Sequence, residues 1–331
     1  MATHDGGDYL EPLLASLLAQ TRPPDELVVC DDASADGTPE RLDAFALTAP
    51  FPVAVHRCAW RGHTETFIDA ARRCTGDAIA FCDADDVWRA DKLALCEEAL
   101  ERSGAILALH TTEVVDEELR PLGRRWPTIE RTEVAETLGL TALDVLAPGM
   151  SMVVRRSVVE VADWEARPHS RYGSDHQMFH DEWVLFLAGV LGPIQLLAEP
   201  LLQYRQHGSN VSGGWVDRRR ERTLRPALDD YRRAHSYTAA CADYLDRTAA
   251  GDVPADVAER LRAGADAYRR DARNWELRAT LYESRQRTRR ARAVRRLIAQ
   301  RAYRDRRSGG FGREALGKDV AAVALRTRPL R

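Results

Sequence analysis

Three carboxylates within four residues follow a short apolar run in the first third of the chain. The run covers residues 78–82 and predicts a buried strand, and Asp83, Asp85 and Asp86 come directly after it. Carboxylates this close repel one another, so they shift each other's pKa or recruit a cation. Hard carboxylate oxygens suit Mg²⁺ or Mn²⁺, and Mg²⁺ completes its shell with substrate phosphates. The stretch therefore predicts a metal-diphosphate site, with a solvated acidic turn as the alternative.

A second predicted strand, residues 26–30, also ends in carboxylates, Asp31 and Asp32. Ligands of open α/β sheets bind in the crevice outside the carboxyl ends of the strands, so we expect both acidic strand ends to face one crevice. The sequence contains neither a G-x-G-x-x-G nor a Walker phosphate loop, which argues against dinucleotide or P-loop chemistry.

The elements that position these residues alternate between strand and helix over about the first 110 residues. This order predicts an α/β fold with a doubly wound, mostly parallel, Rossmann-like sheet. We divide the chain into a nucleotide-binding half over 1–110, an acceptor-binding and catalytic half over 111–215, and an Arg-rich helical region over 216–331. Two short strands are expected at 193–198 and 201–205.

Charge is distributed unevenly along the 331 residues, although the net charge is only −3. Residues 216–331 hold 30 Lys and Arg against 16 Asp and Glu, which leaves 18 against 35 in residues 1–215. Such asymmetry predicts two functional zones. Within the basic zone, residues 285–307 carry 11 Arg, with Val294, Leu297, Ile298 and Tyr303 spaced as an apolar stripe. An anionic membrane surface would suit this helix, and an ordinary solvated helix is the alternative.

Six cysteines show no metal-type spacing, and no apolar run is long enough to span a membrane. We interpret the cysteines as small buried side chains in a reducing compartment. The predicted location is the cytoplasm, with peripheral contact at the inner membrane face as an extension. No nucleic-acid partner is expected, because base-reading and stacking motifs are missing. The oligomeric state stays open, with a homo-oligomer as one alternative.

Several short motifs occur in an order that resembles the family 2 glycosyltransferases with a GT-A fold, and their ending resembles the bacterial rhamnosyltransferase-like branch. The matching segments cover roughly residues 1–215 and are Thr3-His4-Asp5-Gly6, Asp8-Tyr9-Leu10, Gln20-Thr21, residues 28–32, Ser34-Ala35-Asp36-Gly37-Thr38, Gly76-Asp77, Asp83-Ala84-Asp85-Asp86-Val87-Trp88, His180-Asp181 and Tyr204-Arg205-Gln206-His207-Gly208-Ser209-Asn210-Val211.

This resemblance implies inverting transfer of a sugar from a nucleoside-diphosphate sugar. Asp181 matches the catalytic base, with Glu182 as its rival, and Asp85 matches the ligand of a Mg²⁺ or Mn²⁺ ion on the diphosphate. His207 is implied near the same diphosphate, as a ligand or a hydrogen-bond donor. The nucleotide sugar would be contacted by Thr3, Asp5, Asp32, Asp83, Ala84 and Asp85.

The chemistry agrees with these roles, because direct displacement needs one carboxylate base and a cation that offsets charge on the leaving diphosphate. A helix N-cap is the structural alternative for Asp181. The expected donor is dTDP-rhamnose, a related deoxysugar nucleotide or a UDP-sugar. The expected acceptor is a glycan, a lipid-linked glycan or a small natural product. The alternatives are a sugar-nucleotidyltransferase and a non-catalytic membrane- or nucleic-acid-binding protein on a GT-A fold.

The first strand departs from the family pattern, because the sequence starts at Met1, directly before the Thr3-His4-Asp5 segment. We expect that the natural start lies upstream or that this strand is shortened. If the chain folds well as written, we expect Thr3 and Asp5 to be displaced from their sites.

Overall fold

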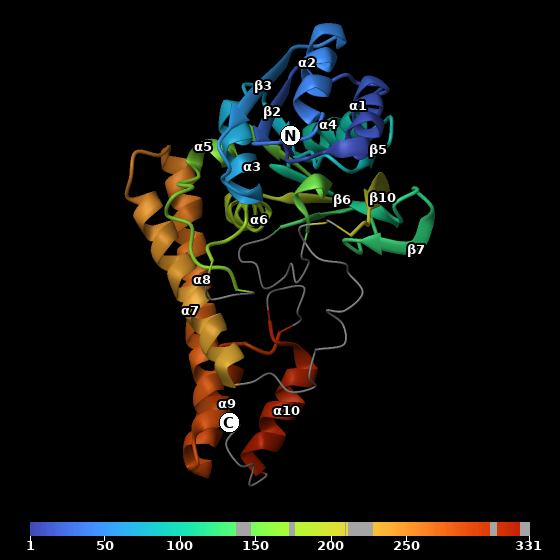
Figure 1. Ribbon diagram of the computed structural model, residues 1–331. Helices are drawn as coiled ribbons and strands as arrows, with labels where there is room; N and C mark the ends of the chain where they lie inside the picture. Colours follow the sequence, from blue (N-terminus) through green and yellow to red (C-terminus); the bar gives the residue numbers. More distant parts are fainter. Residues whose placement is uncertain (137–146, 172–175, 209, 211–227, 305–309, 325–331) are drawn as a thin grey trace.

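The computed structural model describes residues 1–136, 147–171, 176–208, 210, 228–304 and 310–324 (Figure 1). An α/β part built from the first two thirds of the chain lies at one end, and long helices from the last third extend away from it. The predicted boundary near residue 215 lies outside the described residues.

Strand and helix alternate through the first part of the chain, as the sequence predicts. The elements are β1 (Ala2–Thr3), η1 (Gly7–Tyr9), α1 (Leu10–Leu18), β2 (Leu27–Asp32), α2 (Thr38–Thr48), β3 (Val53–Cys58), α3 (His63–Arg73) and β4 (Ala78–Ala80). The first three strands form a parallel sheet in the order β1-β2-β3. Although β1 has only two residues, it pairs Thr3 with Asp31, so the two strand ends lie side by side.

A second, larger sheet has the order β4-β9-β6-β10-β5, with β7 on β6 and β8 on β10. Its pairings are antiparallel except for β6 with β10, so the parallel arrangement that the sequence predicts is confined to the three-stranded sheet and this one pair. The elements are β5 (Val87–Trp88), α4 (Lys92–Ser103), β6 (Leu107–Val115), β7 (Pro121–Trp126), β8 (Glu133–Ala135), η3 (Gly149–Ser151), β9 (Met152–Arg155), α5 (Arg156–Val161), α6 (His180–Leu191) and β10 (Ile194–Arg205).

The strand β10 corrects one prediction, since it is continuous where two short strands were expected. Proline cannot donate a ladder hydrogen bond, so Pro200 predicts an interruption. The chain instead accommodates it with register shifts on either side of Pro200, while β10 continues along β6. Because β10 is continuous, Arg205 and His207 lie beside the acidic loop between β4 and β5.

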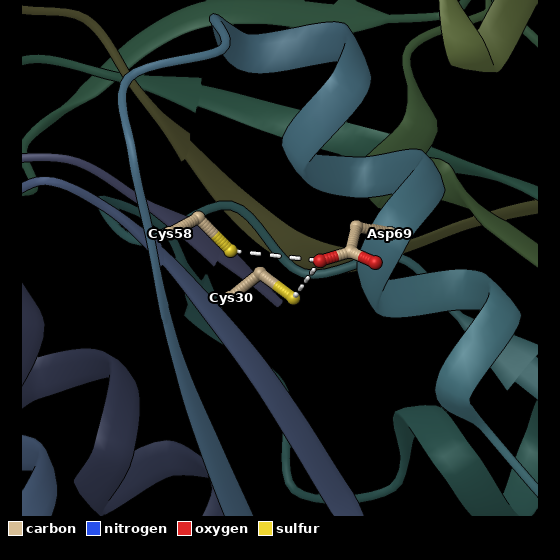
Figure 2. A group of neighbouring side chains, drawn as sticks. All are labelled: Cys30, Cys58 and Asp69. Atoms are coloured by element: carbon tan, nitrogen blue, oxygen red, sulfur yellow. Dashed lines mark hydrogen bonds between the residues drawn. The ribbon is translucent and has the colours of Figure 1, made fainter.

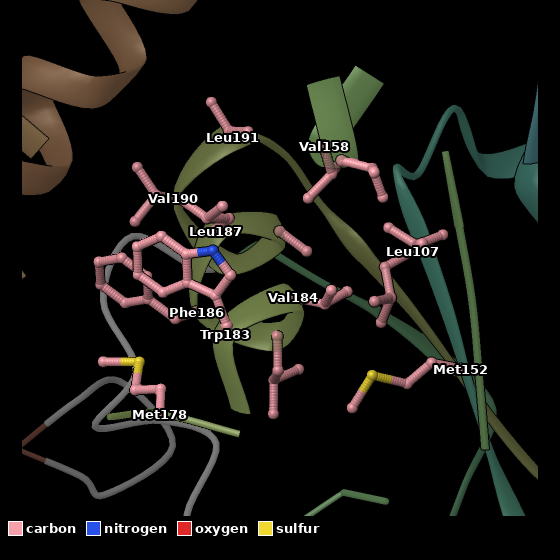
Figure 3. Close-up of a cluster of buried hydrophobic side chains, with 14 of the residues drawn as sticks. Leu107, Met152, Val158, Met178, Trp183, Val184, Phe186, Leu187, Val190 and Leu191 are labelled. Carbon is pink, nitrogen blue, oxygen red and sulfur yellow. The ribbon is translucent and has the colours of Figure 1, made fainter. Parts of the chain in front are cut away.

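The helix α6 is the centre of the main core, and it is apolar on every side, as buried helices are (Figure 3). One face packs on the sheet through Val184 against Leu107 and Met152. Trp183 and Phe186 face the C-terminal helices, with the Trp183 ring 4.6 Å from that of Tyr244. Because α6 contacts both layers, the position of its first turn is fixed by the whole core.

Four helices make up the described C-terminal region, which confirms the helical prediction. They are α7 (Leu228–Ala249), α8 (Ala255–Glu283), α9 (Arg287–Ala299) and α10 (Gly312–Ala324). The hairpin of α7 and α8 lies against α6, and Gly264 permits the approach, because a Cβ there would lie 2.6 Å from Val190. No helix among the described residues has both the length and the apolar character that crossing a membrane requires.

The apolar stripe predicted for a membrane surface packs inside this helical region instead. Val294 and Leu297 of α9 are buried against α8 and α10, Tyr303 is buried beside them, and only Ile298 is exposed. An amphipathic pattern fixes which face is apolar but not what covers it. The expectation that this stripe contacts a membrane is therefore wrong for three of its four residues.

A buried carboxylate joins α10 to α8. Asp319 has no exposed surface and accepts hydrogen bonds from Arg278 at 3.0 and 3.1 Å, from Tyr282 at 2.7 Å and from Tyr303 at 2.8 Å. A buried charge is tolerated when its pairing and hydrogen bonding are this complete.

Candidate functional site

The acidic loop between β4 and β5 holds three carboxylates in three different environments. Asp86 is fully buried, and its Oδ1 accepts the Arg205 amide at 3.1 Å. Burial raises its pKa well above the usual value, and the charges of Asp85 and Asp83 add to the effect. Asp86 thus fastens the loop to the end of β10, whereas Asp83 and Asp85 keep side-chain exposures of 26% and 23%.

Asp85 meets residues that follow β10. The His207 Nε2 lies 2.8 Å from Asp85 Oδ2, and the Asn210 amide nitrogen donates to the same oxygen at 3.2 Å. The ring of Tyr9 packs on that of His207 with centroids 4.4 Å apart, and the Arg205 guanidinium lies over the Tyr9 ring at 4.8 Å. The predicted pairing of Asp85 with His207 in one site is therefore present in the geometry.

Asp83 belongs to the same electrostatic site as Asp181. Burial, together with the charges of Asp85 and Asp181, raises the pKa of Asp83 to about 8. The His63 Nε2 lies 4.0 Å from Asp83 Oδ1, and the His63 ring lies 5.1 Å from that of His180. The loop and the first turn of α6 thus approach each other, although 98 residues separate Asp83 from Asp181.

Asp181 is the second residue of α6, and its environment suits a base. The N-cap position is occupied by Phe179, so the helix-cap alternative for Asp181 is wrong. The Glu182 amide donates to Asp181 Oδ1 at 2.7 Å. Burial raises the pKa of Asp181 to about 6, while hydrogen bonds from the Glu182 and Gly149 amides oppose that rise. A carboxylate with this pKa is ionised near neutral pH and can still accept a proton.

The rival base, Glu182, points to a different segment. Its Oε1 accepts the Arg171 amide at 3.4 Å, and burial raises its pKa. Adjacent residues on a helix lie on different faces, so the site that Asp181 shares with Asp83 does not include Glu182.

The predicted nucleotide-binding residues lie at the ends of β1 and β2. Both Asp32 oxygens accept backbone amides, from Arg61 at 2.7 Å and from Gly62 at 2.8 Å. Asp5 accepts the Ala35 amide at 2.7 Å. Thr3 is buried, and its hydroxyl has no hydrogen-bond partner among the described residues. Asp32 therefore orients the turn that begins α3, a role that the sequence did not reveal.

Three further site residues were missed at the sequence level. Tyr9 and Asn210 contact the Asp85–His207 pair, and Gly149 lies against the first turn of α6. Asn210 and Tyr9 stand inside quoted motifs, but nothing in those motifs shows that the two segments meet. Of the segment after β10, Ser209 and Val211 lie outside the described residues.

The donor atoms at this site fit Mg²⁺ or Mn²⁺ bound together with a diphosphate. Asp85 and His207 supply two ligand atoms 2.8 Å apart, with the Asp83 carboxylate beside them in the same loop. Within the part of the chain that the structure describes, a group of three possible ligand atoms that lie within 4.8 Å of one another occurs only at Cys30, Cys58 and Asp69, outside this site. Mg²⁺ sites often use one or two carboxylates plus substrate phosphates, so an incomplete protein shell is the expected arrangement.

The chain is similar in sequence to a known protein family and to several individual proteins. Residues 1–161 match Glycosyl transferase family 2. Over 207 residues the chain is 27% identical to the uncharacterized glycosyltransferase alr2836 of Nostoc sp., covering 61% of this chain and 62% of that protein. Over 104 residues it is 33% identical to TuaG of Bacillus subtilis, a glycosyltransferase named for teichuronic acid biosynthesis, covering 31% and 41% of the two chains. The chain thus spans less than two thirds of the length of either relative.

Among solved structures, S. aureus TarS in complex with UDP-GlcNAc aligns with a TM-score of 0.54 at 16% identity, covering 91% of this chain and 86% of that chain. A likeness at this identity establishes the fold, so the predicted GT-A-like α/β architecture with a helical C-terminal region is confirmed. The rhamnosyltransferase-like branch stays a prediction. The family match, with the order of motifs along this segment, identifies residues 1–161 as a family 2 glycosyltransferase domain.

Proposed function

We propose that this chain transfers a sugar, with inversion, from a nucleoside-diphosphate sugar to a hydroxyl group of its acceptor. The observation that carries the proposal is the meeting of three distant segments at one place. The acidic loop brings Asp83 and Asp85, the segment after β10 brings His207, and the first turn of α6 brings Asp181. Donor, metal and base functions are thereby assigned to adjacent parts of one site.

Asp181 is the proposed base, because direct displacement at the anomeric carbon requires removal of one acceptor proton. Its pKa of about 6 leaves the carboxylate ionised at neutral pH. The Glu182 amide, which donates to Asp181 Oδ1 at 2.7 Å, holds the carboxylate in position before the acceptor binds. One displacement of this kind inverts the configuration of the sugar.

Asp85 and His207 are proposed to hold Mg²⁺ or Mn²⁺, and such an ion, when bound, offsets the negative charge that develops on the leaving diphosphate. Thr3, Asp5, Asp32, Asp83 and Ala84 are proposed to line the donor site around the nucleoside. Thr3 supports this role with an unpartnered buried hydroxyl at the end of β1. The proposed donor is a UDP-sugar, a dTDP-sugar or a related nucleotide sugar.

The proposed acceptor is a polysaccharide or another hydroxyl-bearing glycan, which includes lipid-linked glycans and glycosylated small molecules. TuaG, whose name assigns it to teichuronic acid biosynthesis, supports this class. Contact of the exposed α9 arginines with an anionic surface would now depend mainly on charge, since three of the four stripe residues are buried. A cytoplasmic location and a homo-oligomeric state are likewise proposals.

Release of nucleoside diphosphate tests the proposal, measured with UDP-, dTDP- and GDP-sugars in the presence of Mn²⁺. We expect one donor class to give turnover that Asp181→Asn lowers by about 10²–10⁴-fold, the usual contribution of a general base. Glu182→Gln is the matched control, because its carboxylate faces Arg171, and it should keep most of the activity. Full turnover in Asp181→Asn, or equal losses in both variants, would contradict the assignment.

A further inference from the structure

Two cysteines and an aspartate converge between β2, β3 and α3, and none of them is among the residues assigned to the chemistry described above. Cys30 lies on β2, Cys58 lies near the end of β3, and Asp69 extends from α3 toward both (Figure 2). Their two sulfur atoms and one carboxylate oxygen all lie within 4.8 Å of one another. We propose that Cys30, Cys58 and Asp69 form a binding site for a thiophilic divalent cation, with Zn²⁺ as the natural candidate.

The distances match a tetrahedral ion closely. Asp69 Oδ2 lies 3.6 Å from Cys30 Sγ and 3.5 Å from Cys58 Sγ. Zinc ligated at about 2.3 Å by sulfur and about 2.1 Å by oxygen places those two atoms roughly 3.6 Å apart. The carboxylate oxygen therefore already has, from each of the two sulfur atoms, the separation that an ion would impose.

The carboxylate is oriented for this role by its other oxygen. Arg73 donates to Asp69 Oδ1 at 3.1 Å, which leaves Oδ2 directed at the two thiols. Hydrogen bonds to a ligating group fix its orientation in established metal sites. Cys30 is fully buried, whereas Cys58 and Asp69 are partly exposed, so an ion can enter between the β3 edge and α3.

The strand register argues against a disulfide as the purpose of the cluster. Cys30 is paired with His56, so Cys58 lies diagonally across from it, two residues further along β3. Strands about 4.8 Å apart and two residues of about 3.3 Å each place the two Cα atoms roughly 8 Å apart. That exceeds the approximately 7 Å limit for a disulfide without backbone movement.

A fourth ligand is available from the same sheet or from water. Side chains paired across parallel strands share a face, so His56 lies on the face that carries Cys30 and Cys58. Its ring nitrogens lie outside the three-atom cluster. Zinc sites with three protein ligands keep a water in the remaining position, so His56 is not required.

A bound ion would stiffen the donor side of the molecule. It would join β2, β3 and α3, and β2 ends at Asp32, whose carboxylate holds the Arg61–Gly62 turn before α3. Binding must displace the thiol protons, and burial raises the pKa of Cys30 to about 12, so affinity should increase with pH. The site does not use any residue assigned to the donor metal.

Titration of the reduced full-length protein with Cd²⁺ tests the proposal through the ultraviolet absorption of the cadmium–thiolate bond. We expect a band that saturates at a single ion per chain and disappears in Cys58→Ala. Cys96→Ala changes a buried cysteine of α4 that is outside the cluster, and it should keep the full band. Asp85→Ala should also keep the band, which separates this site from the proposed donor metal.

Two measurements keep the test decisive if a cysteine variant folds poorly. Asp69→Asn preserves the shape of the side chain and should weaken Cd²⁺ binding by at least about tenfold. X-ray absorption of the zinc-loaded wild type needs no variant and should show Zn–S distances of about 2.3 Å. A wild-type protein with no thiolate band, or a band that survives Cys58→Ala, would mean that the two thiols only hydrogen-bond to Asp69.

Discussion

His207 Nε2 lies 2.8 Å from Asp85 Oδ2, although 122 residues separate the two in the sequence. The contact depends on the continuous strand β10, whose last residue, Arg205, is fastened to Asp86. Two carboxylates of the acidic loop thus have different tasks. Asp86 positions the segment after β10, and Asp85 contacts His207 of that segment.

Replacement of His207 by alanine should weaken Mn²⁺ binding in the presence of a nucleoside diphosphate by about tenfold or more, because one of the two converging ligand atoms is lost. The expected loss is in metal affinity, measured by titration calorimetry, with secondary structure unchanged by circular dichroism. His176→Ala removes an imidazole from a different segment and serves as the control. Unchanged Mn²⁺ affinity in His207→Ala would show that His207 only orients Asp85.

Turnover should rise as the pH increases through about 6, because Asp181 must be ionised to act as a base and its pKa is raised to that value. The pH dependence of kcat/KM in the free enzyme checks this, since that quantity reports the free-enzyme pKa. A profile with no rising limb between pH 5 and 7 would contradict the role of Asp181.

The contribution of Asp83 to stability without metal should decrease as the pH rises from about 4 to about 8. The pKa of Asp83 is raised from 3.8 to about 8, so the folded state binds more protons than the unfolded state in that range. The pKa of buried Lys92 is lowered to about 8, so its contribution favours folding with rising pH only above that value. Denaturant unfolding at several pH values should show a shallower decrease in Asp83→Asn. An identical slope in the wild type and the variant would exclude Asp83 as the cause.

Gly149→Ala should impair the site, since a Cβ at this position would lie 2.7 Å from His180 Nε2 and 3.6 Å from the Asp181 Cβ. The His180 ring cannot move aside easily, because it is buried and stacked on Phe67 at 4.2 Å. We expect lower turnover and a lower Tm.

Gly317→Ala in α10 is the matched control, because it has open space around its Cβ position and should stabilise the protein by about 0.5–1 kcal/mol. Normal activity and Tm in Gly149→Ala would show that the first turn of α6 tolerates displacement.

Asp319→Ala should destabilise the protein by about 3–5 kcal/mol, because it leaves the buried Arg278 guanidinium without its charge partner. Asp266→Ala removes a carboxylate from an exposed pair with Arg269 and should cost less than about 1 kcal/mol. Chemical denaturation measures both. Equal effects would mean that the Asp319 cluster contributes no more than a surface ion pair.

Local patterns were sufficient to predict the strands that carry the site. Apolar runs followed by carboxylates located the ends of β2 and β4 to within two residues, because buried strands need apolar side chains and ligand sites need polar ones. Such signals arise within a few residues and do not depend on how the chain folds back on itself.

Relationships between distant segments could not be predicted in the same way. Nothing in the sequence of the acidic loop distinguishes Asp85 from Asp86. The approach of β10 buries Asp86 and leaves Asp85 beside His207. The stripe on α9 is amphipathic whether it meets a membrane or another helix, and the folded chain covers it with α8 and α10. Cys30, Cys58 and Asp69 have no motif spacing, because strand register and helix packing bring them together.

The most direct test of the central claim is calorimetric titration of UDP, dTDP and GDP into the wild type and Asp85→Asn, with and without Mn²⁺. Asp91→Asn, which removes a carboxylate paired with Arg89 outside the acidic loop, is the control for charge. Our account predicts that Mn²⁺ strengthens binding of one nucleotide by about tenfold or more in the wild type and in Asp91→Asn, and not in Asp85→Asn. Full Mn²⁺ dependence in Asp85→Asn would contradict the assignment of the acidic loop as the metal-diphosphate site.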